Sequence, residues 1–148
     1  MAVILKSANL SVSPEAAWGI VDRFMRADIR VFSFIIENRI DGPVRTVVSE
    51  GLEQPEMNIT IDHDHMYASY SLLESPYWQD GYHHGCMRVF DTGNGRCRFE
   101  WITDFAPDSK AVLFSEEFLD TLWSELVNVL ETGEEAPSAP AVAVPIHR

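Results

Sequence analysis

The 148-residue sequence predicts an α+β fold, in which a curved antiparallel sheet of about seven strands surrounds a long C-terminal helix and two short helices follow the first strand. Two observations predict this fold. Six strand-like segments follow one another between residues 31 and 105, and the turns between them are so short that neighbouring strands must be antiparallel. One large amphipathic helix comes last, and a sheet of this size needs such a partner to bury one face.

The N-terminal part supplies the first strand and the short helices. Residues 2–12 are typical of a strand. Ser13-Pro14-Glu15 then predicts a helix start, because Ser caps a helix, Pro suits the first helical position and an acid favours the positive end of the dipole. Apolar residues at helical spacing, from Ala17 to Phe24, continue this helix, and we expect residues 25–30 to form a second short turn.

The remaining strands and the last helix follow in order. Turns rich in Gly, Pro and Asp bound the strands, which cover residues 31–40, 44–51, 56–62, 66–74, 82–91 and 96–105. Pro107-Asp108 begins the long helix, and Gly133 ends it. We therefore predict a single domain over residues 1–133, followed over residues 134–148 by a loosely packed tail rich in Pro and Ala.

The composition excludes several classes of function. Acidic residues outnumber basic residues by 23 to 11, and a net charge of −12 argues against binding to nucleic acid or to anionic membranes. No apolar run reaches the roughly 18 residues of a membrane span, and the N-terminus does not resemble a signal peptide. Cys86 and Cys97 are too few for a disulfide scaffold. We expect a cytoplasmic protein.

The register of the hairpin over residues 82–105 can be predicted. A three-residue loop at residues 93–95 places charged partners on one face and apolar partners on the other, which is the favoured pattern of cross-strand pairing. His83 then points toward the core, His84 points away from it, and Gly85 leaves room beside His83. The predicted pairs are Arg88–Glu100 and His84–Asp104 on the first face, and Val89–Phe99, Met87–Trp101, Gly85–Thr103 and His83–Phe105 on the second.

Several stretches together resemble a known superfamily. They are SPEAAW at 13–18, GPVR at 42–45, the acids Glu56 and Asp62, YSLLESP at 70–76, VFDTGNGRCRFEW at 89–101 and the closing helix. In this order and spacing the sequence resembles the START/Bet v1-like (SRPBCC) superfamily, most closely its polyketide cyclase/dehydrase branch. The resemblance implies a helix-grip fold with a deep hydrophobic cavity between the sheet and the last helix.

Four residues are candidates for catalysis. His83 has a side chain that titrates near neutral pH and could move a proton from carbon to oxygen, although it could instead be a structural histidine. Arg45 matches the Arg of the family's G-x-x-R strand and could hold a carboxylate or a developing enolate; the alternative is an ion pair with Glu56. Tyr70 matches a tyrosine position of the family, where a phenol could donate to a carbonyl or carry a proton; the alternative is a packed ring whose hydroxyl is satisfied at an edge of the core.

Glu56 matches an acid of the family and is a candidate base, with Asn58 on the same face as a hydrogen-bond donor. The pattern of the strand points the other way, because Met57, Ile59 and Ile61 form the more apolar face. The resemblance and the periodicity therefore disagree, and the face that lines the cavity stays open.

Six further residues are expected to line the cavity, and their apolar, mostly aromatic side chains suit a flat, unsaturated ligand. The alternative is that they belong to the core, and we expect about half of them to touch a ligand. They are Met87, Phe99, Trp101, Phe105, Phe114 and Phe118. The sequence Asp62-His63-Asp64-His65 contains an H-x-H pair but lacks a third ligand at suitable spacing, so we expect no metal site.

The resemblance implies a small cofactor-independent enzyme that cyclises, dehydrates or aromatises a hydrophobic, polyketide-like or aromatic intermediate. The alternative is a non-catalytic binding or transport protein for a lipid or aromatic metabolite. The substrate could arrive free or on an acyl carrier protein, but an acidic carrier would be repelled by the net charge of −12. A homodimer is also compatible with the sequence.

Overall fold

The computed structural model describes residues 2–76 and 78–138. Their strands and helices follow the order β1 (Ala2–Leu10), α1 (Pro14–Met25), β2 (Glu37–Asp41), β3 (Val44–Ser49), β4 (Leu52–Asp62), β5 (Tyr67–Leu72), β6 (Tyr82–Gly93), β7 (Arg96–Ala106), α2 (Asp108–Glu117) and α3 (Leu119–Thr132). This confirms the predicted α+β class.

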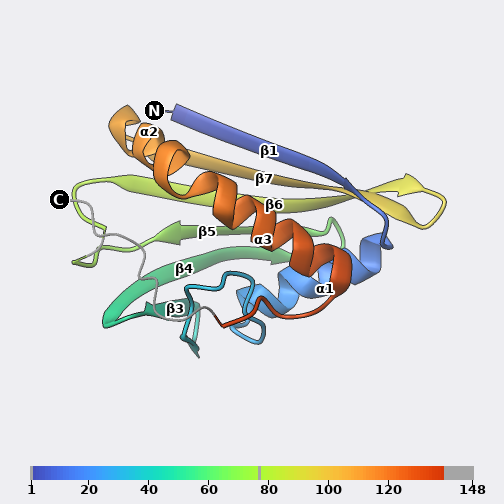
Figure 1. Cartoon of the computed structure of the whole chain (residues 1–148), viewed down its shortest axis with the longest axis horizontal. Helices are drawn as coiled ribbons and strands as arrows, with labels where there is room; N and C mark the ends of the chain where they lie inside the picture. The colour runs from blue at the N-terminus through green and yellow to red at the C-terminus, as the bar shows by residue number, and fades with distance from the viewer. Residues whose placement is uncertain (1, 77, 139–148) are drawn as a thin grey trace.

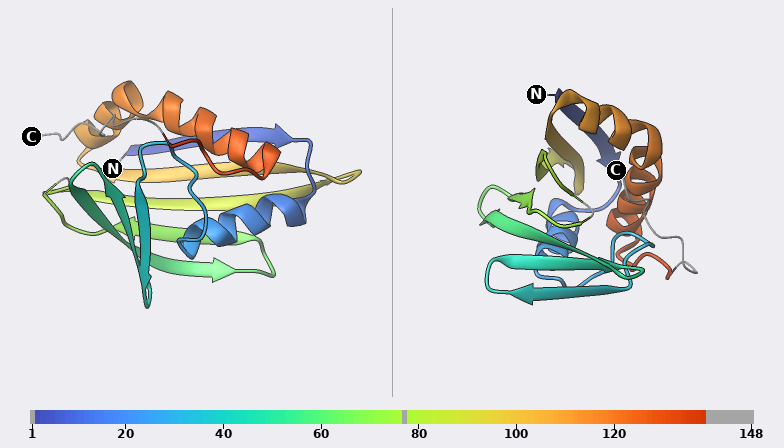
Figure 2. Two further views of the ribbon diagram at one scale, coloured as in Figure 1. Left: turned by 60° about the horizontal axis from the view of Figure 1, so that its bottom comes forward. Right: turned by 90° about the vertical axis from the view of Figure 1, so that its left-hand side faces the viewer.

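The seven strands form one antiparallel sheet in the order β1-β7-β6-β5-β4-β3-β2. Helix α3 crosses the sheet diagonally, and α1 lies on the same side (Figure 1). The sheet curves around these helices, which is clearest in the right-hand view of Figure 2. The core therefore lies between the concave face of the sheet and the helices. Its helical side is formed by Val21 and Phe24 of α1 and by Leu126, Val129 and Leu130 of α3.

Helix α1 begins as the sequence predicts. The side chain of Ser13 accepts a hydrogen bond of 3.1 Å from the backbone N–H of Ala16, and Pro14 is the first helical residue. The expected second short helix does not form. Ala27 has a φ of 58°, a left-handed conformation that interrupts the helical backbone directly after α1.

Residues 31–36, predicted to begin a strand, form irregular turns instead, and β2 starts only at Glu37. Val31, Phe32 and Ile35 are all buried. This spacing does not alternate between two faces, as a strand requires, so the segment buries its apolar side chains without joining the sheet.

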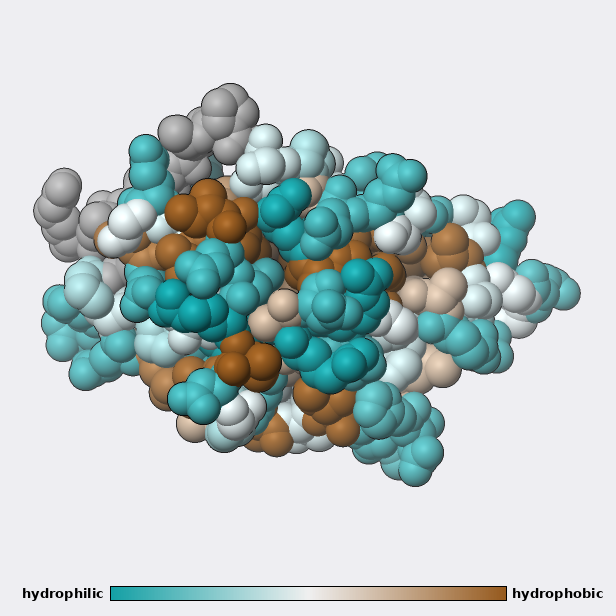
Figure 3. Space-filling view, turned by 90° about the horizontal axis from the view of Figure 1, so that it is seen from below, coloured by the Kyte–Doolittle hydropathy of each residue, from teal (hydrophilic) through white to brown (hydrophobic). Residues whose placement is uncertain are grey.

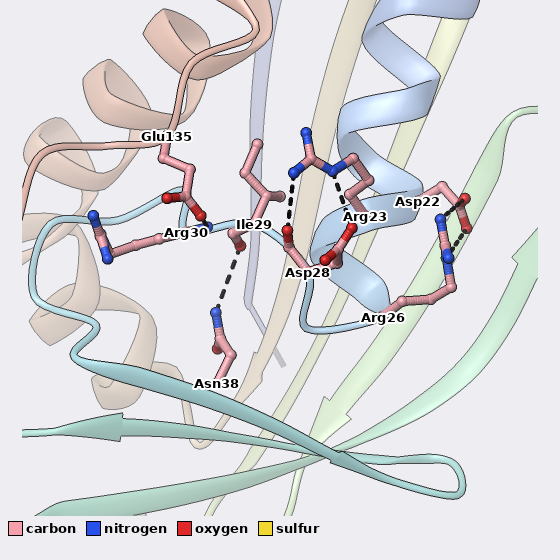
Figure 4. A network of polar contacts seen from close by, with 8 residues as sticks. All are labelled: Asp22, Arg23, Arg26, Asp28, Ile29, Arg30, Asn38 and Glu135. Atoms are coloured by element: carbon pink, nitrogen blue, oxygen red, sulfur yellow. Dashed lines mark hydrogen bonds and ion pairs between the residues drawn. The ribbon is translucent and has the colours of Figure 1, made fainter.

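Polar contacts fix the chain between α1 and β2 (Figure 4). Arg23 donates hydrogen bonds to the carboxylate and the backbone carbonyl of Asp28. Arg26 donates to both carboxylate oxygens of Asp22 one turn earlier. Because these pairs are exposed, each adds little stability, but together they define the path of the turn.

The predicted single helix from residue 108 to residue 133 is divided at Phe118 into α2 and α3. Phe118 has φ −124° and ψ −37°, which departs from helical geometry. Its N–H nevertheless donates to the carbonyl of Phe114, and its carbonyl accepts from Leu122, both at 3.0 Å. The hydrogen-bond ladder thus continues through a local distortion. Gly133, with φ 72°, ends α3 as predicted.

The predicted register of the β6–β7 hairpin is confirmed, including the pairs Arg88–Glu100 and His83–Phe105. The predicted three-residue loop is wrong. Only residues 94 and 95 lie between the strands, and an irregularity between Asp91 and Gly93 supplies the extra residue. The bulge adds one residue to β6. The pairs on the far side of the bulge from the turn therefore have the register that a three-residue loop would give them.

The start of the predicted loose tail is packed against the domain. Ala136 is buried, its N–H donates to the carbonyl of Arg30 at 2.9 Å, and its carbonyl accepts from Arg30 Nε at the same distance. Glu135 accepts a further hydrogen bond from the backbone N–H of Arg30 (Figure 4). The rest of the predicted tail, residues 139–148, lies outside the described residues.

Figure 3 shows one face of the molecule, on which hydrophilic residues (teal) separate the hydrophobic residues (brown) into several patches. This face therefore presents no single large apolar area. Within residues 2–76 and 78–138, every helix is too short or too polar to cross a membrane.

Substitution of Gly85 by Ala should destabilise the fold. A Cβ at this position would lie 2.4 Å from Tyr70 Cζ, far inside van der Waals contact, and Tyr70 is itself buried. We expect the free energy of unfolding to fall by about 1–3 kcal/mol, the usual cost of overpacking a core. Chemical denaturation measures this change.

The matched control is Gly19→Ala in the middle of α1, where an added Cβ meets nothing within 4 Å. Ala is favoured over Gly in a helix by about 1 kcal/mol, so this variant should be more stable than the parent protein. Equal effects of the two substitutions would contradict the packing of Tyr70 over Gly85.

Candidate functional site

Two of the predicted catalytic residues lie in one row across the middle of the sheet. Glu56 of β4 pairs with Leu72 of β5. The next registered pair, between β5 and β6, is Ser71–His84, so Leu72 lies opposite His83. Since neighbouring strands are about 4.8 Å apart, the backbones of Glu56 and His83 are roughly 10 Å apart, with one apolar residue between them.

A cavity of about 110 Å³ lies between this row and the helices α1, α2 and α3. One water molecule needs roughly 10–15 Å³ by the same measure, so the space is large enough for a small organic group. Six of the residues singled out from the sequence line it: Glu56, Tyr70, His83, Trp101, Phe114 and Phe118. The other five do not belong to its lining: Arg45, Asn58, Met87, Phe99 and Phe105.

Arg45 is fully buried behind Glu56. Its Nη2 donates to Glu56 Oε1 at 2.8 Å, and its guanidinium lies over the ring of Phe24 with 4.3 Å to the centroid. Burial raises the pKa of the Glu56 carboxyl above its ordinary value, and the attraction of Arg45 offsets only part of this effect. The arrangement is the ion pair considered from the sequence, and only its acidic member borders the cavity.

A β-bulge explains why Glu56 faces the cavity although the strand pattern argued against it. The pairing of β4 with β5 shifts between Asn58 and Thr60, and Ile59 at this point is 53% exposed. Beyond the bulge Ile61 packs against the core. Before the bulge the strand turns the face with Glu56 inward, and after the bulge it turns the face with Ile61 inward. A simple alternation of inward and outward residues therefore does not describe the whole strand.

Asn58 is turned toward α1 and not toward the cavity. Its side-chain amide donates to the backbone carbonyl of Met25 at 2.6 Å. Met25 is the last residue of α1, and its carbonyl has no partner within the helix. Asn58 thus fixes the end of α1 against the sheet.

Tyr70 forms the wall between Glu56 and Trp101. Its hydroxyl oxygen accepts a hydrogen bond of 3.0 Å from Trp101 Nε1, and its ring fills the space that Gly85 leaves free. Burial raises the pKa of the Tyr70 phenol above its ordinary value, so the side chain stays protonated at neutral pH.

His83 lies among aromatic rings. Its ring centroid is 4.3 Å from that of Phe105, 5.5 Å from that of Trp78 and 5.7 Å from that of Phe114. Burial lowers the pKa of His83 to about 3, and the nearby His84 adds a smaller effect in the same direction. The imidazole is therefore neutral at physiological pH.

Sequence reasoning missed many of the residues that line the cavity. Phe24 belongs to the apolar stripe predicted for α1, but nothing in the pattern shows that the stripe reaches a cavity. Trp78 lies in the irregular segment between β5 and β6, where the one available signal was a large aromatic residue in a polar stretch. The missed residues also include Phe32, Phe34, Ile35, Val47, Ser49, Leu52, Gln54, Leu72, Lys110, Leu113 and Leu122.

The turn at residues 62–65 has a structural role. Asp62 accepts hydrogen bonds from the backbone N–H groups of Asp64 and His65, and His63 Nδ1 accepts one of 3.1 Å from Trp18 Nε1 of α1. In the part of the chain that the structure describes, His, Cys, Asp and Glu form no cluster of three or more that could hold a metal ion.

No protein-family model matches the sequence, and no curated protein matches it. Solved structures do match. The aromatase/cyclase ZhuI from Streptomyces sp. R1128 superimposes with a TM-score of 0.70 at 15% identity, over 89% of this chain and 92% of that one. The protein XoxI from Bacillus cereus gives 0.69 at 21% identity, over 90% and 95%.

A third match is norcoclaurine synthase from Thalictrum flavum in complex with dopamine and hydroxybenzaldehyde. Its TM-score is 0.64 at 15% identity, over 91% of this chain and 89% of that one. At such identities these likenesses establish the fold.

Acid should destabilise the protein through His83. Its pKa is lowered from 6.5 to about 3 on folding, so the unfolded chain takes up a proton that the folded chain refuses. The stability that His83 contributes is complete above about pH 6.5 and is lost as the pH falls toward 3. Between about pH 7 and pH 5 the free energy of unfolding should fall by about 2 kcal/mol more than in a His83→Phe variant.

Denaturant unfolding at several pH values measures this difference. The raised pKa of Glu56 has an effect of opposite sign, but both proteins contain it, so it cancels in the comparison. The control His84→Gln should keep most of the acid sensitivity, because burial is the main cause of the shift at His83. If the free energy of unfolding depends on pH in the same way in the parent protein and in His83→Phe, His83 is not a buried neutral imidazole.

Proposed function

We propose that this protein, which has the Bet v1-like helix-grip fold that the sequence resemblance implied, binds a small hydrophobic molecule in its cavity and catalyses a proton transfer that cyclises or dehydrates it. The observation that carries the proposal is that Glu56 and His83 face the same largely aromatic cavity from two strands. The substrate class is a polyketide-like or aromatic intermediate with a carbonyl group.

Glu56 is the proposed base. A general base works best when its pKa lies near the working pH, and burial moves the pKa of Glu56 upward, toward that range. His83 is less suited to accept a proton, since its pKa of about 3 makes it a weak base. This revises the proton-shuttle role considered from the sequence, in which His83 was the principal base. Arg45 would hold the Glu56 carboxylate in place and not contact an enolate itself.

The walls of the cavity would position the substrate. Phe24, Phe32, Trp101 and Phe114 present rings from α1, the following turns, β7 and α2. Flat rings pack well against such walls, and holding a flexible molecule in a reactive shape lowers the entropic part of the barrier.

The structural matches support the proposal by analogy. One is an aromatase/cyclase, and another is a synthase bound to dopamine and hydroxybenzaldehyde, which are small aromatic molecules. Because one fold hosts many functions, the argument rests on the side chains of this cavity.

The second candidate function is non-catalytic binding or transport of an aromatic or lipid metabolite. The Arg45–Glu56 ion pair favours it, because a carboxylate that serves only to neutralise a buried guanidinium needs no substrate. Both functions require the same cavity. Delivery of a substrate by an acidic acyl carrier protein is disfavoured by the net charge of −12.

Exchange of carbon-bound hydrogen in 2-tetralone tests the catalytic proposal. This bicyclic ketone has acidic protons beside its carbonyl group, and NMR in D₂O follows their replacement by deuterium. The protein should accelerate the exchange. Glu56→Gln should reduce the protein-dependent rate about 100-fold, the usual loss on removal of a general base, while the dissociation constant changes less than about threefold.

Gln can still accept the hydrogen bond from Arg45, but it leaves the buried guanidinium without a countercharge, so Glu56→Gln should lose about 3–5 kcal/mol of stability. The exchange rates are therefore compared per folded molecule, with the folded fraction measured by circular dichroism. The control is Glu53→Gln on the same strand, which is exposed and outside the cavity lining. If 2-tetralone binds and the rate is the same in the parent protein, in Glu56→Gln and in buffer, the binding function replaces the catalytic one.

A further inference from the structure

Two buried nitrogen atoms of the cavity wall have no hydrogen-bond partner among the described residues. They are Nε2 of His83 and Nε1 of Trp78. Both residues line the cavity, and His83 is only 5% exposed. A buried polar nitrogen without a partner loses its hydrogen bond to water and gains none in return, so such atoms in a cavity wall point to a missing partner inside the cavity.

The chemistry of the two nitrogens specifies that partner. An indole Nε1–H is only a donor, so Trp78 needs an acceptor. The imidazole of His83 is neutral, because burial lowers its pKa to about 3, and a neutral imidazole can carry its proton on Nε2. When that proton is on Nε2, one oxygen with two lone pairs satisfies both nitrogens.

The two rings are held on the same wall. Their centroids are 5.5 Å apart, and both rings pack against Phe105, at 4.3 Å from His83 and 6.2 Å from Trp78. Lys110 adds positive charge beside them, with its Nζ 4.8 Å from the centroid of the Trp78 ring. Among the lining residues of the cavity, the acidic one is Glu56, two strands away from His83. This end of the cavity therefore favours an oxygen that carries negative charge.

From these observations we infer that Trp78 and His83 form a two-donor site that binds one ketone or enolate oxygen of the ligand. The inference deepens the proposed function and rests on it for the identity of the ligand class. It also gives His83 a role as hydrogen-bond donor and makes Trp78 a specificity-determining residue.

The site orients the ligand relative to Glu56. With the oxygen at His83 and Trp78, the carbon beside the carbonyl extends across Leu72 toward β4. The C–H bond there breaks, the proton goes to the Glu56 carboxylate, and the electron pair forms an enolate whose oxygen stays bound by the two donors. Donors already aimed at the developing charge stabilise the transition state more than the ground state.

Two probes that differ only at the oxygen test the inference: 2-tetralone and the corresponding hydrocarbon tetralin. Trp78→Phe removes the N–H and keeps an aromatic ring. We expect it to weaken binding of 2-tetralone about 5- to 10-fold, as loss of one hydrogen bond does, and to change binding of tetralin less than about twofold. Affinities follow from quenching of the fluorescence of Trp101, which remains in the variant.

A second measurement does not depend on the variant. The infrared carbonyl stretch of 2-tetralone should move to lower frequency when the ketone binds the parent protein, and part of this shift should be lost in Trp78→Phe. Phe118→Leu is the matched control for an apolar change in the wall, and it should affect the two probes equally.

The outcomes separate the two proposals. If 2-tetralone binds better than tetralin only when Trp78 is present, yet its hydrogens do not exchange, the two-donor site stands and the catalytic function falls. Equal losses for both probes in Trp78→Phe, or an unshifted carbonyl band in the parent protein, overturn the two-donor site and leave the exchange result to decide catalysis. Failure of both probes to bind overturns both proposals.

Discussion

The buried ion pair between Arg45 and Glu56 is the constraint on which the interior depends. A fully buried guanidinium costs several kcal/mol in desolvation unless a carboxylate lies beside it, and the cross-strand register of β3 and β4 places Glu56 there. The pair adds little net stability by itself, but it dictates which face of β4 turns inward. A carboxylate thereby reaches the edge of an otherwise apolar cavity. The bulge after Asn58 then returns Ile61 to the core, so that the rest of the strand still buries apolar surface.

Burial acts on two groups of this cavity in opposite directions. It raises the pKa of Glu56 and lowers that of His83, because in each case it disfavours the charged form. The acid thus becomes a stronger base than an exposed Glu, and the histidine becomes a neutral hydrogen-bonding group. Opposite pKa shifts of this kind suit one group to accepting a proton and the other to donating a hydrogen bond while it stays neutral. The roles that we propose follow from the surroundings of the two groups: Arg45 supports the charge on Glu56, whereas aromatic rings surround His83.

The register of β6 and β7 could be predicted for the pairs from His83–Phe105 to Val89–Phe99, because charge pairs and apolar pairs along two adjacent strands admit one register. The loop that joins the strands could not, because a bulge beside a two-residue turn gives the same pairs as a longer loop. The inward position of His83 follows from that register alone. The orientation of Glu56 could not be predicted, since a bulge breaks the period and leaves no mark in the pattern of the strand. Trp78 and Phe34 lie in segments without regular structure, where no period relates sequence to position. The distortion at Phe118 also has no local signal, as neither Gly nor Pro occurs there.

The curvature of the sheet and the aromatic side chains inside it explain why a cavity remains between the sheet and the helices. Packing normally fills the space between a sheet and a helix, yet here the sheet bends around α3, and the side chains in the bend are rigid rings that meet at edges and tilted angles. The ring centroids of Trp101 and Phe114, for example, are 6.1 Å apart, and the ring planes meet at 82°. Rings held in this way cannot collapse inward as flexible side chains would. Nε2 of His83 and Nε1 of Trp78, which have no hydrogen-bond partner among the described residues, belong to this rigid frame. The rings cannot turn freely toward other groups of the described chain, which is why we propose that the ligand supplies their acceptor.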